Sequence, residues 1–183
     1  MRFSESEIKG LFQIEYIIAE DKRGQFFRTY SSAVFKDAGL IANFIQHNHV
    51  INPKKGTWRG LHFQHAPFGE IKLVRCIRGR VMDYVVDLRK DSPTYLRHCS
   101  FDLNEDVPNA LWIPQGMAHG YITLEDNTEM AYLHSAEYNP SAEDGLRYDD
   151  PAIKLTLPCE VAVISDRDMN FNLLSERKKS YPL

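Results

Sequence analysis

Titratable side chains interrupt four otherwise apolar runs in the middle of the chain, and their types suit proton transfer. They are His62, Lys72, His119 and Tyr132. Histidine is the usual general base near neutral pH, and a tyrosine hydroxyl can return a proton as an acid. A lysine ammonium can stabilise the negative oxygen that forms when a proton leaves a carbon next to a ketone. Together these side chains suit the removal and return of such a proton.

Strand signals dominate the sequence and supply the elements that must position these groups. Short runs rich in Val, Ile, Tyr and Phe are separated by turns containing Gly, Pro, Asn and Asp. The predicted extended segments are 14–18, 25–30, 43–49, 58–64, 71–77, 81–88, 96–103, 110–114, 120–124, 129–134 and 161–164. One short helix is predicted over 31–38 and a polar loop over 139–151. Many short strands at this spacing are typical of a sandwich or a barrel.

The period of two along a strand predicts which side chains share a face. Alternation places His62 on the same face as Trp58 and Gln64, and places Lys72 and Tyr132 on faces that could point inward. A small barrel with these groups inside would hold a polar pocket. The pattern alone is also compatible with an outward Lys72, a structural His62 and a Tyr132 that only packs.

The composition limits the class of protein. A chain of 183 residues, 43% of them hydrophobic, suits one domain with a real core, so we expect a single domain over 1–183. With 22 basic and 25 acidic residues the net charge is −3, which argues against a nucleic-acid partner. No run approaches the ~20 apolar residues of a membrane span, and the N-terminus lacks an apolar signal core. We therefore expect a cytoplasmic protein without a membrane partner.

Neither the cysteines nor the basic cluster near the C-terminus indicates a functional site. Cys76, Cys99 and Cys159 are widely spaced and form neither a zinc-type pair nor a disulfide framework, which favours a reducing compartment. The basic cluster at 177–179 is predicted to be a solvated tail.

A metal site is the competing chemical interpretation. Metal-binding cupins carry a His-x-His motif with a later Glu, followed by Pro-x-Gly-x-x-His. Residues 114–119 fit the second motif, but Gln64 occupies the second histidine position of the first. His62 and His119 are then the two well-placed ligands, with Glu70 nearby, whereas a catalytic metal normally needs three. We therefore predict no metal.

An ordered set of motifs resembles the dTDP-4-dehydrorhamnose 3,5-epimerase family. The matching segments are 21–26, 46–48, 56–64 (GTWRGLHFQ), 72–76, 83–89, 92–95, 113–120, Tyr132, 137–140, 143–145, 149–151 and 165–168. The resemblance covers roughly residues 8–170. It implies an all-β cupin or jelly-roll β-barrel with short helices at the periphery. It also implies an N-terminal strand arm over about 1–30 and an irregular C-terminal tail over about 165–183.

By position, the resemblance also implies roles. It makes His62 the base, Asp168 its orienting partner, Tyr132 the acid on the opposite sugar face and Lys72 the cation beside the C4 carbonyl. The implied contacts to a dTDP-sugar are Arg23, Gln46, Asn48, Arg59, His119, Tyr138 and Glu143, with the ring of Tyr138 stacked on thymine. Family members are homodimers that exchange an N-terminal strand, so Arg23 is expected to reach the neighbour's site. No cofactor is implied.

Two departures from the family pattern bear on the substrate. Arg28 stands where the family usually has glutamate, and Val50 and Asn52 replace serines. Inverting a charge near the expected ligand raises the hypothesis of a single-centre epimerase or related keto-sugar isomerase, in place of epimerisation at both C3 and C5. A non-catalytic cupin that binds a nucleotide sugar and a metal-dependent cupin oxygenase are two further hypotheses.

Overall fold

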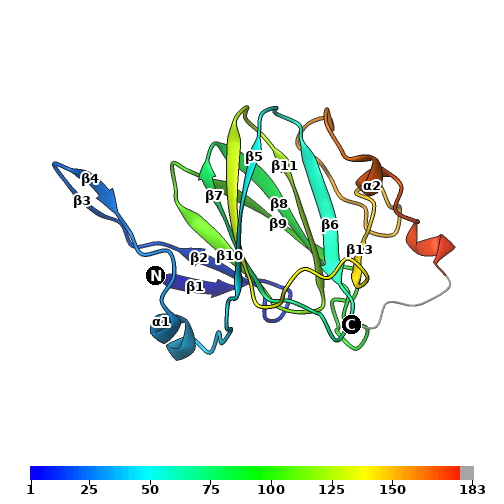
Figure 1. Ribbon diagram of the computed structural model, residues 1–183, viewed down its shortest axis with the longest axis horizontal. Coiled ribbons are helices and arrows are strands. Elements are labelled where there is room, and N and C mark those ends of the chain that lie inside the picture. Colours follow the sequence, from blue (N-terminus) through cyan, green and yellow to red (C-terminus); the bar gives the residue numbers. More distant parts are fainter. Residues whose placement is uncertain (178–183) are drawn as a thin grey trace.

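Two antiparallel sheets face each other in the computed structural model, which describes residues 1–177 (Figure 1). The six-stranded sheet has the order β1 (Arg2–Glu5), β2 (Phe12–Glu15), β10 (Asn109–Ile113), β7 (Lys72–Arg78), β12 (Thr128–His134), β5 (Gln46–Asn52). The five-stranded sheet has the order β13 (Glu143–Gly145), β6 (Trp58–Gln64), β11 (Met117–Thr123), β8 (Arg80–Asp87), β9 (His98–Asn104). This architecture confirms the predicted all-β, cupin-like barrel.

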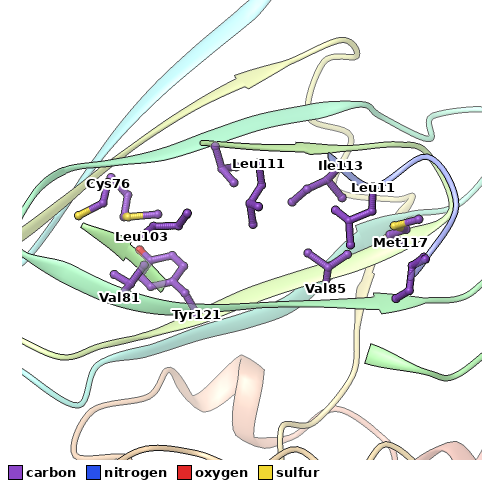
Figure 2. Close-up of a cluster of buried hydrophobic side chains, with 12 residues drawn as sticks. Leu11, Cys76, Val81, Val85, Leu103, Leu111, Ile113, Met117 and Tyr121 are labelled. Atoms are coloured by element: carbon purple, nitrogen blue, oxygen red, sulfur yellow. The ribbon is translucent and has the colours of Figure 1, made fainter. Parts of the chain in front are cut away.

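An apolar cluster fills one end of the space between the sheets. Leu111 and Ile113 of the six-stranded sheet face Val85 and Tyr121 of the five-stranded sheet (Figure 2). All four side chains are buried. Tyr121 of this cluster also borders the polar space beside it, so the packed core and the polar interior adjoin.

Different parts of the chain cover the outer faces of the two sheets. Helix α1 (Ser32–Asp37) places Phe35 against Trp112 on the six-stranded sheet, with ring centroids 5.7 Å apart. The C-terminal part of the chain covers the five-stranded sheet, where Leu146 and Ile153 pack in the cluster of Trp58. Helix α2 (Asp166–Met169) lies beside β6 (Figure 1), and the 3₁₀ helix η1 (Leu174–Glu176) follows it. No helix of residues 1–177 is long and apolar enough to cross a membrane.

The hairpin of β3 (Ala19–Asp21) and β4 (Gly24–Phe26) projects from the barrel at the far left of Figure 1. It forms a two-stranded sheet of its own, and Phe26 is 70% exposed at its end. The predicted arm over 1–30 is therefore divided, because β1 and β2 belong to the six-stranded sheet and the hairpin alone projects from it.

A close crossing between β6 and β11 determines which side chains of β6 point inward. Gly60 has a φ of +123°, and a Cβ there would lie 2.5 Å from Cα of Gly120, so only glycine fits. The register of β6 against β11 shifts at this crossing, which breaks the strict alternation of faces. Arg59 and His62 therefore both line the interior, while Trp58 packs in the outer cluster. The prediction that Trp58 shares the face of His62 is wrong for this reason.

Several predicted segments differ from the structure near the C-terminus. The predicted strand over 161–164 is reduced to one parallel bridge between Thr57 and Val163, and the predicted polar loop over 139–151 contains β13. The predicted irregular tail carries α2 and η1. Arg177 is not part of a solvated tail, because its side chain is 11% exposed and its Nη1 lies 2.9 Å from Oδ2 of Asp144. Residues 178–183 lie outside the described part of the chain.

Candidate active site

A cavity of about 270 Å³ opens between the two sheets at the end that the apolar cluster leaves free. Nine of the eleven predicted site residues line it: Gln46, Asn48, Arg59, His62, Lys72, His119, Tyr132, Tyr138 and Glu143. Of the remaining two, Asp168 lies behind His62, and Arg23 lies away from the cavity on the projecting hairpin. The sequence therefore identified most of the cavity wall.

His62 and Asp168 form a hydrogen-bonded pair across the wall of the cavity. Nε2 of His62 lies 2.8 Å from Oδ1 of Asp168, whose side chain is 3% exposed. Burial alone would raise the pKa of Asp168, but the hydrogen bonds from His62 and from the Gly60 N–H hold it below its usual value. A carboxylate at this position fixes the imidazole tautomer with the proton on Nε2, which leaves Nδ1 to accept a proton.

Helix α2 delivers a second group to His62 that the sequence interpretation missed. Nε of Arg167 lies 3.5 Å from Oδ1 of Asp168, and its Nη2 lies 3.2 Å from Nε2 of His62, which donates its own proton to Asp168. Nη1 of Arg167 lies 2.5 Å from Oε2 of Glu143. The hydroxyl of Tyr138 donates to the same glutamate oxygen at 2.6 Å. Arg167 thus links the His62–Asp168 pair to the mouth of the cavity.

Tyr132 supplies a hydroxyl oxygen that is buried and makes no close, well-aligned hydrogen bond among the described residues, although the Tyr121 hydroxyl is near enough to interact with it. Its ring is only partly buried and lies 6.1 Å from the His119 ring, on the sheet that faces His62. Burial, with a smaller effect of Tyr121, raises the pKa of Tyr132 well above its usual value. The group therefore stays protonated near neutral pH, and its O–H is available to a ligand.

Lys72 lies in the same wall as Tyr132, with its side chain 8% exposed. Its Nζ lies 3.1 Å from Oε1 of Glu70 and donates to the His62 carbonyl oxygen at 3.3 Å. Lys72 therefore points inward, which is one of the two orientations that the sequence pattern left open. Glu70, considered from the sequence as a nearby metal ligand, is instead the ion-pair partner of this lysine.

His119 belongs to a second pair of a histidine and a carboxylate. Its Nε2 lies 2.8 Å from Oδ2 of Asp83, which is fully buried and whose Oδ1 has no hydrogen-bond partner among the described residues. Burial raises the pKa of Asp83 despite the opposing effect of His119. The sequence contained a signal for this residue, because Asp83 alternates with the inward side chains Val81 and Val85.

Polar groups extend the cavity away from the His62–Asp168 pair. Nε of Arg59 donates to Oδ1 of Asn52 at 2.8 Å, so the residue that replaces a family serine holds this guanidinium in place. At the mouth, Gln46 bonds to Asn48 at 3.2 Å and accepts from the backbone N–H of Tyr138 at 3.2 Å. The half-exposed Tyr138 ring is thereby held where a flat ligand group could stack.

Arg23 and Arg28, the two arginines singled out in the N-terminal part of the sequence, lie outside the cavity. The guanidinium of Arg23 is 82% exposed and bonds to Asp21 within the hairpin, at 2.6 Å. Arg28 borders a surface groove beside Phe26 and Ile17 rather than the main cavity. Within one chain, the charge inversion at Arg28 therefore does not reach the cavity.

The donor groups of the cavity do not suit a metal. Among residues 1–177, no three His, Cys, Asp or Glu side chains gather in a group that could hold a metal ion. Gln64, at the second histidine position of metal-binding cupins, donates to the Phe68 carbonyl oxygen at 3.2 Å and accepts from the Asn139 N–H at 2.7 Å. Both the N–H and the oxygen of its amide are therefore used in hydrogen bonds to the surrounding loops.

Comparison with known proteins gives one consistent family. The sequence model of dTDP-4-dehydrorhamnose 3,5-epimerase matches residues 5–176. The chain is 36% identical to the dTDP-4-dehydrorhamnose 3,5-epimerase of Shigella flexneri, over 93% of this chain and 94% of that protein.

Solved structures agree with this result. The dTDP-6-deoxy-D-glucose-3,5-epimerase of Legionella pneumophila, in complex with dTDP-4-keto-L-rhamnose, superposes with a TM-score of 0.92 at 30% identity, covering 99% of this chain and 97% of that one. A 3'-monoepimerase from Streptomyces bikiniensis, in complex with dTDP-quinovose, gives 0.86 at 28% identity, covering 93% and 86%. The predicted family and the carbohydrate epimerase class are confirmed: the chain belongs to the dTDP-4-dehydrorhamnose 3,5-epimerase family.

Proposed function

We propose that this chain epimerises a dTDP-4-keto-6-deoxyhexose at C3 and C5, converting dTDP-4-dehydro-6-deoxyglucose to dTDP-4-dehydrorhamnose. The observation that carries the proposal is the arrangement of the cavity walls. His62, paired with Asp168 of α2, comes from one sheet, and the buried Tyr132 hydroxyl comes from the facing sheet. A sugar ring between the sheets would thus meet a base on one face and an acid on the other.

The proposed reaction begins at a carbon next to the C4 carbonyl. Nδ1 of His62 takes the proton, the C–H electron pair forms a C=C bond, and the carbonyl π electrons move to oxygen. The Lys72 ammonium stabilises the resulting enolate, an effect worth roughly 3 kcal/mol in a water-excluded site. No electrons leave the substrate, so the step needs no redox cofactor.

The second half of the reaction inverts the centre. Tyr132 gives its phenolic proton to the same carbon from the opposite face, a new C–H bond forms and the carbonyl is restored. The imidazolium of His62 then releases a proton and the tyrosinate takes one up, both by exchange with water. Because C3 and C5 both flank C4, the same groups can act at either carbon.

The remaining polar residues suit the nucleotide. The Arg59 guanidinium is a bidentate donor of the kind that binds a diphosphate. The half-exposed ring of Tyr138 can stack on thymine, and Gln46, Asn48 and Glu143 offer hydrogen bonds at the same mouth. A single-centre epimerase remains the second candidate, because Val50 and Asn52 replace family serines beside the cavity and a 3'-monoepimerase shares the fold.

Solvent exchange tests both candidates. The protein is incubated with dTDP-4-keto-6-deoxyglucose in deuterated water, and the sugar protons are followed by proton NMR. We expect deuterium at both C3 and C5, together with inverted product. Deuterium at one carbon alone supports the single-centre candidate, and the absence of deuterium at both carbons contradicts the proposed function.

We also propose a homodimer in which the hairpin of one chain reaches its neighbour's cavity. The hairpin of β3 and β4 projects from the barrel (Figure 1). Its Phe26 is exposed, and Arg23 is not among the residues that line this chain's own cavity. A monomeric mass in solution at working concentration would contradict this assembly. A cytoplasmic location fits the three free cysteines and is tested by cell fractionation.

We expect activity to survive exhaustive chelation, and metal analysis of the purified protein to find less than about one ion per ten chains. The physical reason is that proton transfer through an enolate needs only the side chains described above, with Gln64 in place of a histidine ligand. Activity that is lost on chelation and restored by one divalent ion would show that a metal takes part.

A further inference from the structure

A buried carboxylate that the proposed reaction does not use lies beside Lys72. Glu70 precedes β7 by two residues, and its side chain is 10% exposed. Its Oε1 lies 3.1 Å from Nζ of Lys72, and its Oε2 lies 2.8 Å from Nδ1 of His134. Nε2 of Gln64 approaches the same Oε2 at 3.4 Å. The carboxylate thus lies against an ammonium, an amide N–H and a histidine nitrogen.

The ion pair explains how a nearly buried lysine can stay charged. An ammonium that loses its water without gaining a counter-ion is strongly disfavoured, and usually becomes neutral instead. Burial opposes the charged form of Glu70 as well, yet Lys72 and His134 together lower the pKa of this carboxyl to about 2. The carboxylate is therefore ionised throughout the neutral range and is always available to Lys72.

The two protein contacts of the Lys72 ammonium also determine where its remaining N–H points. An ammonium has three N–H groups. One is directed at Oε1 of Glu70 and a second at the carbonyl oxygen of His62. The third is left for a ligand in the cavity that Lys72 lines. Because Glu70 is itself held by His134 on the neighbouring strand β12, neither of the two fixed contacts depends on the ligand.

We propose that Glu70 is the positioning residue of Lys72: it keeps the ammonium charged inside the cavity and aims its remaining N–H at the carbonyl oxygen of the bound sugar. The second part of this inference rests on the proposed function, whereas the first part concerns the charge state of Lys72 alone. Glu70 touches no reacting atom and acts only through the lysine.

Other titratable groups line the cavity with Lys72 or lie close enough to interact with it, and the test must separate their effects on the charge of Lys72 from the effect of Glu70. They are His62 of β6, Asp83 of β8, His119 of β11, and Tyr132 and His134 of β12. Asp83 already has His119 as its partner at 2.8 Å, so it cannot replace Glu70 without breaking that pair.

The test compares Glu70→Gln with Glu70→Asp. Glutamine keeps the size and an oxygen acceptor but removes the charge, while aspartate keeps the charge on a shorter side chain. In Glu70→Gln we expect kcat to fall about 10- to 100-fold with KM changed less than about threefold. This is below the roughly 100- to 1000-fold cost of losing a stabilising donor outright, because Lys72 itself is still present. The alkaline decline of kcat should also begin at lower pH, because an unpaired buried ammonium loses its proton more easily. Glu70→Asp should keep the native alkaline limb.

A second measurement needs no activity. The pH dependence of acetylation of Lys72 by acetic anhydride, followed by mass spectrometry, reports when the amine becomes neutral. Its midpoint should fall by more than about one pH unit in Glu70→Gln and stay unchanged in Glu129→Gln. The latter removes a carboxylate that pairs with His49 at 3.0 Å outside the cavity.

An unchanged midpoint in Glu70→Gln overturns the inference whether or not the protein is an epimerase. The native protein could show no deuterium exchange at C3 or C5 while the acetylation midpoint of Lys72 still falls in Glu70→Gln. The proposed function would then fail, but the inference that Glu70 keeps Lys72 charged would stand.

Discussion

Replacing His62 with alanine should abolish both epimerisation and solvent exchange at C3 and C5. The imidazole is oriented by Asp168 through the 2.8 Å contact at Nε2, which leaves its other nitrogen free to act as the base. General-base catalysis contributes roughly 100- to 10,000-fold, so the rate of deuterium incorporation should fall by at least that range. The measurement is a proton NMR time course in deuterated water with the keto-sugar as substrate.

Two variants make this result specific. His62→Gln keeps an amide N–H near the position of Nε2 that can donate to Asp168, so it guards against a loss caused by leaving that buried carboxylate without a partner. His49→Ala removes a histidine that also pairs with a carboxylate, Glu129 at 3.0 Å, but lies on the outer face of β5. His49→Ala should retain native exchange. Exchange above about a tenth of the native rate in both His62 variants would remove His62 from the role of base.

In Tyr132→Phe, exchange and inversion should separate. His62 can still take a proton and return it to the same face, so deuterium should enter the substrate with retained configuration. Inverted product should fall by orders of magnitude, because the group on the opposite face is gone. The phenyl ring keeps its contacts with the rings of His119 and Tyr121, at 6.1 and 6.4 Å. The change removes a weak interaction with the Tyr121 hydroxyl and no close hydrogen bond among the described residues, so stability should change little.

The same experiment tests whether Tyr132 only packs. A packing residue predicts near-native inversion in the phenylalanine variant, since the ring remains. Tyr84→Phe is the matched control: its hydroxyl donates to the Thr156 carbonyl oxygen at 2.8 Å outside the cavity, and its loss should leave inversion intact. Inverted product forming at the native rate in Tyr132→Phe would leave the acid on the opposite face unidentified.

Regular alternation explains why so much of the site could be predicted from sequence. Lys72 and Tyr132 lie in stretches of β7 and β12 where the period of two holds, so alternation left two possible faces for each, and both side chains line the cavity. The roles of these residues came from the family motifs, and the structure now places them around one cavity. Their catalytic roles stay predictions until the variants are measured.

Features that depend on partners far along the chain could not be predicted. The shift at Gly60 arises from contact with Gly120, and it moved Trp58 to the outer face. The pairing of Glu70 with His134 joins side chains 64 residues apart, which no local pattern reveals. The charge at Arg167 was missed because a four-residue helix gives almost no sequence signal.

The orientation of His62 depends on Asp168, which lies in a segment that is synthesised late. Asp168 follows His62 by 106 residues in the sequence. It belongs to α2, which comes after every strand of the two sheets, since the last of them, β13, ends at Gly145. During synthesis the N-terminal part of a chain is available to fold first. The barrel can therefore close around His62 and Tyr132 before the carboxylate that orients the imidazole exists. A nascent chain, or one clipped before Ser165, would lack the carboxylate that orients the imidazole of His62.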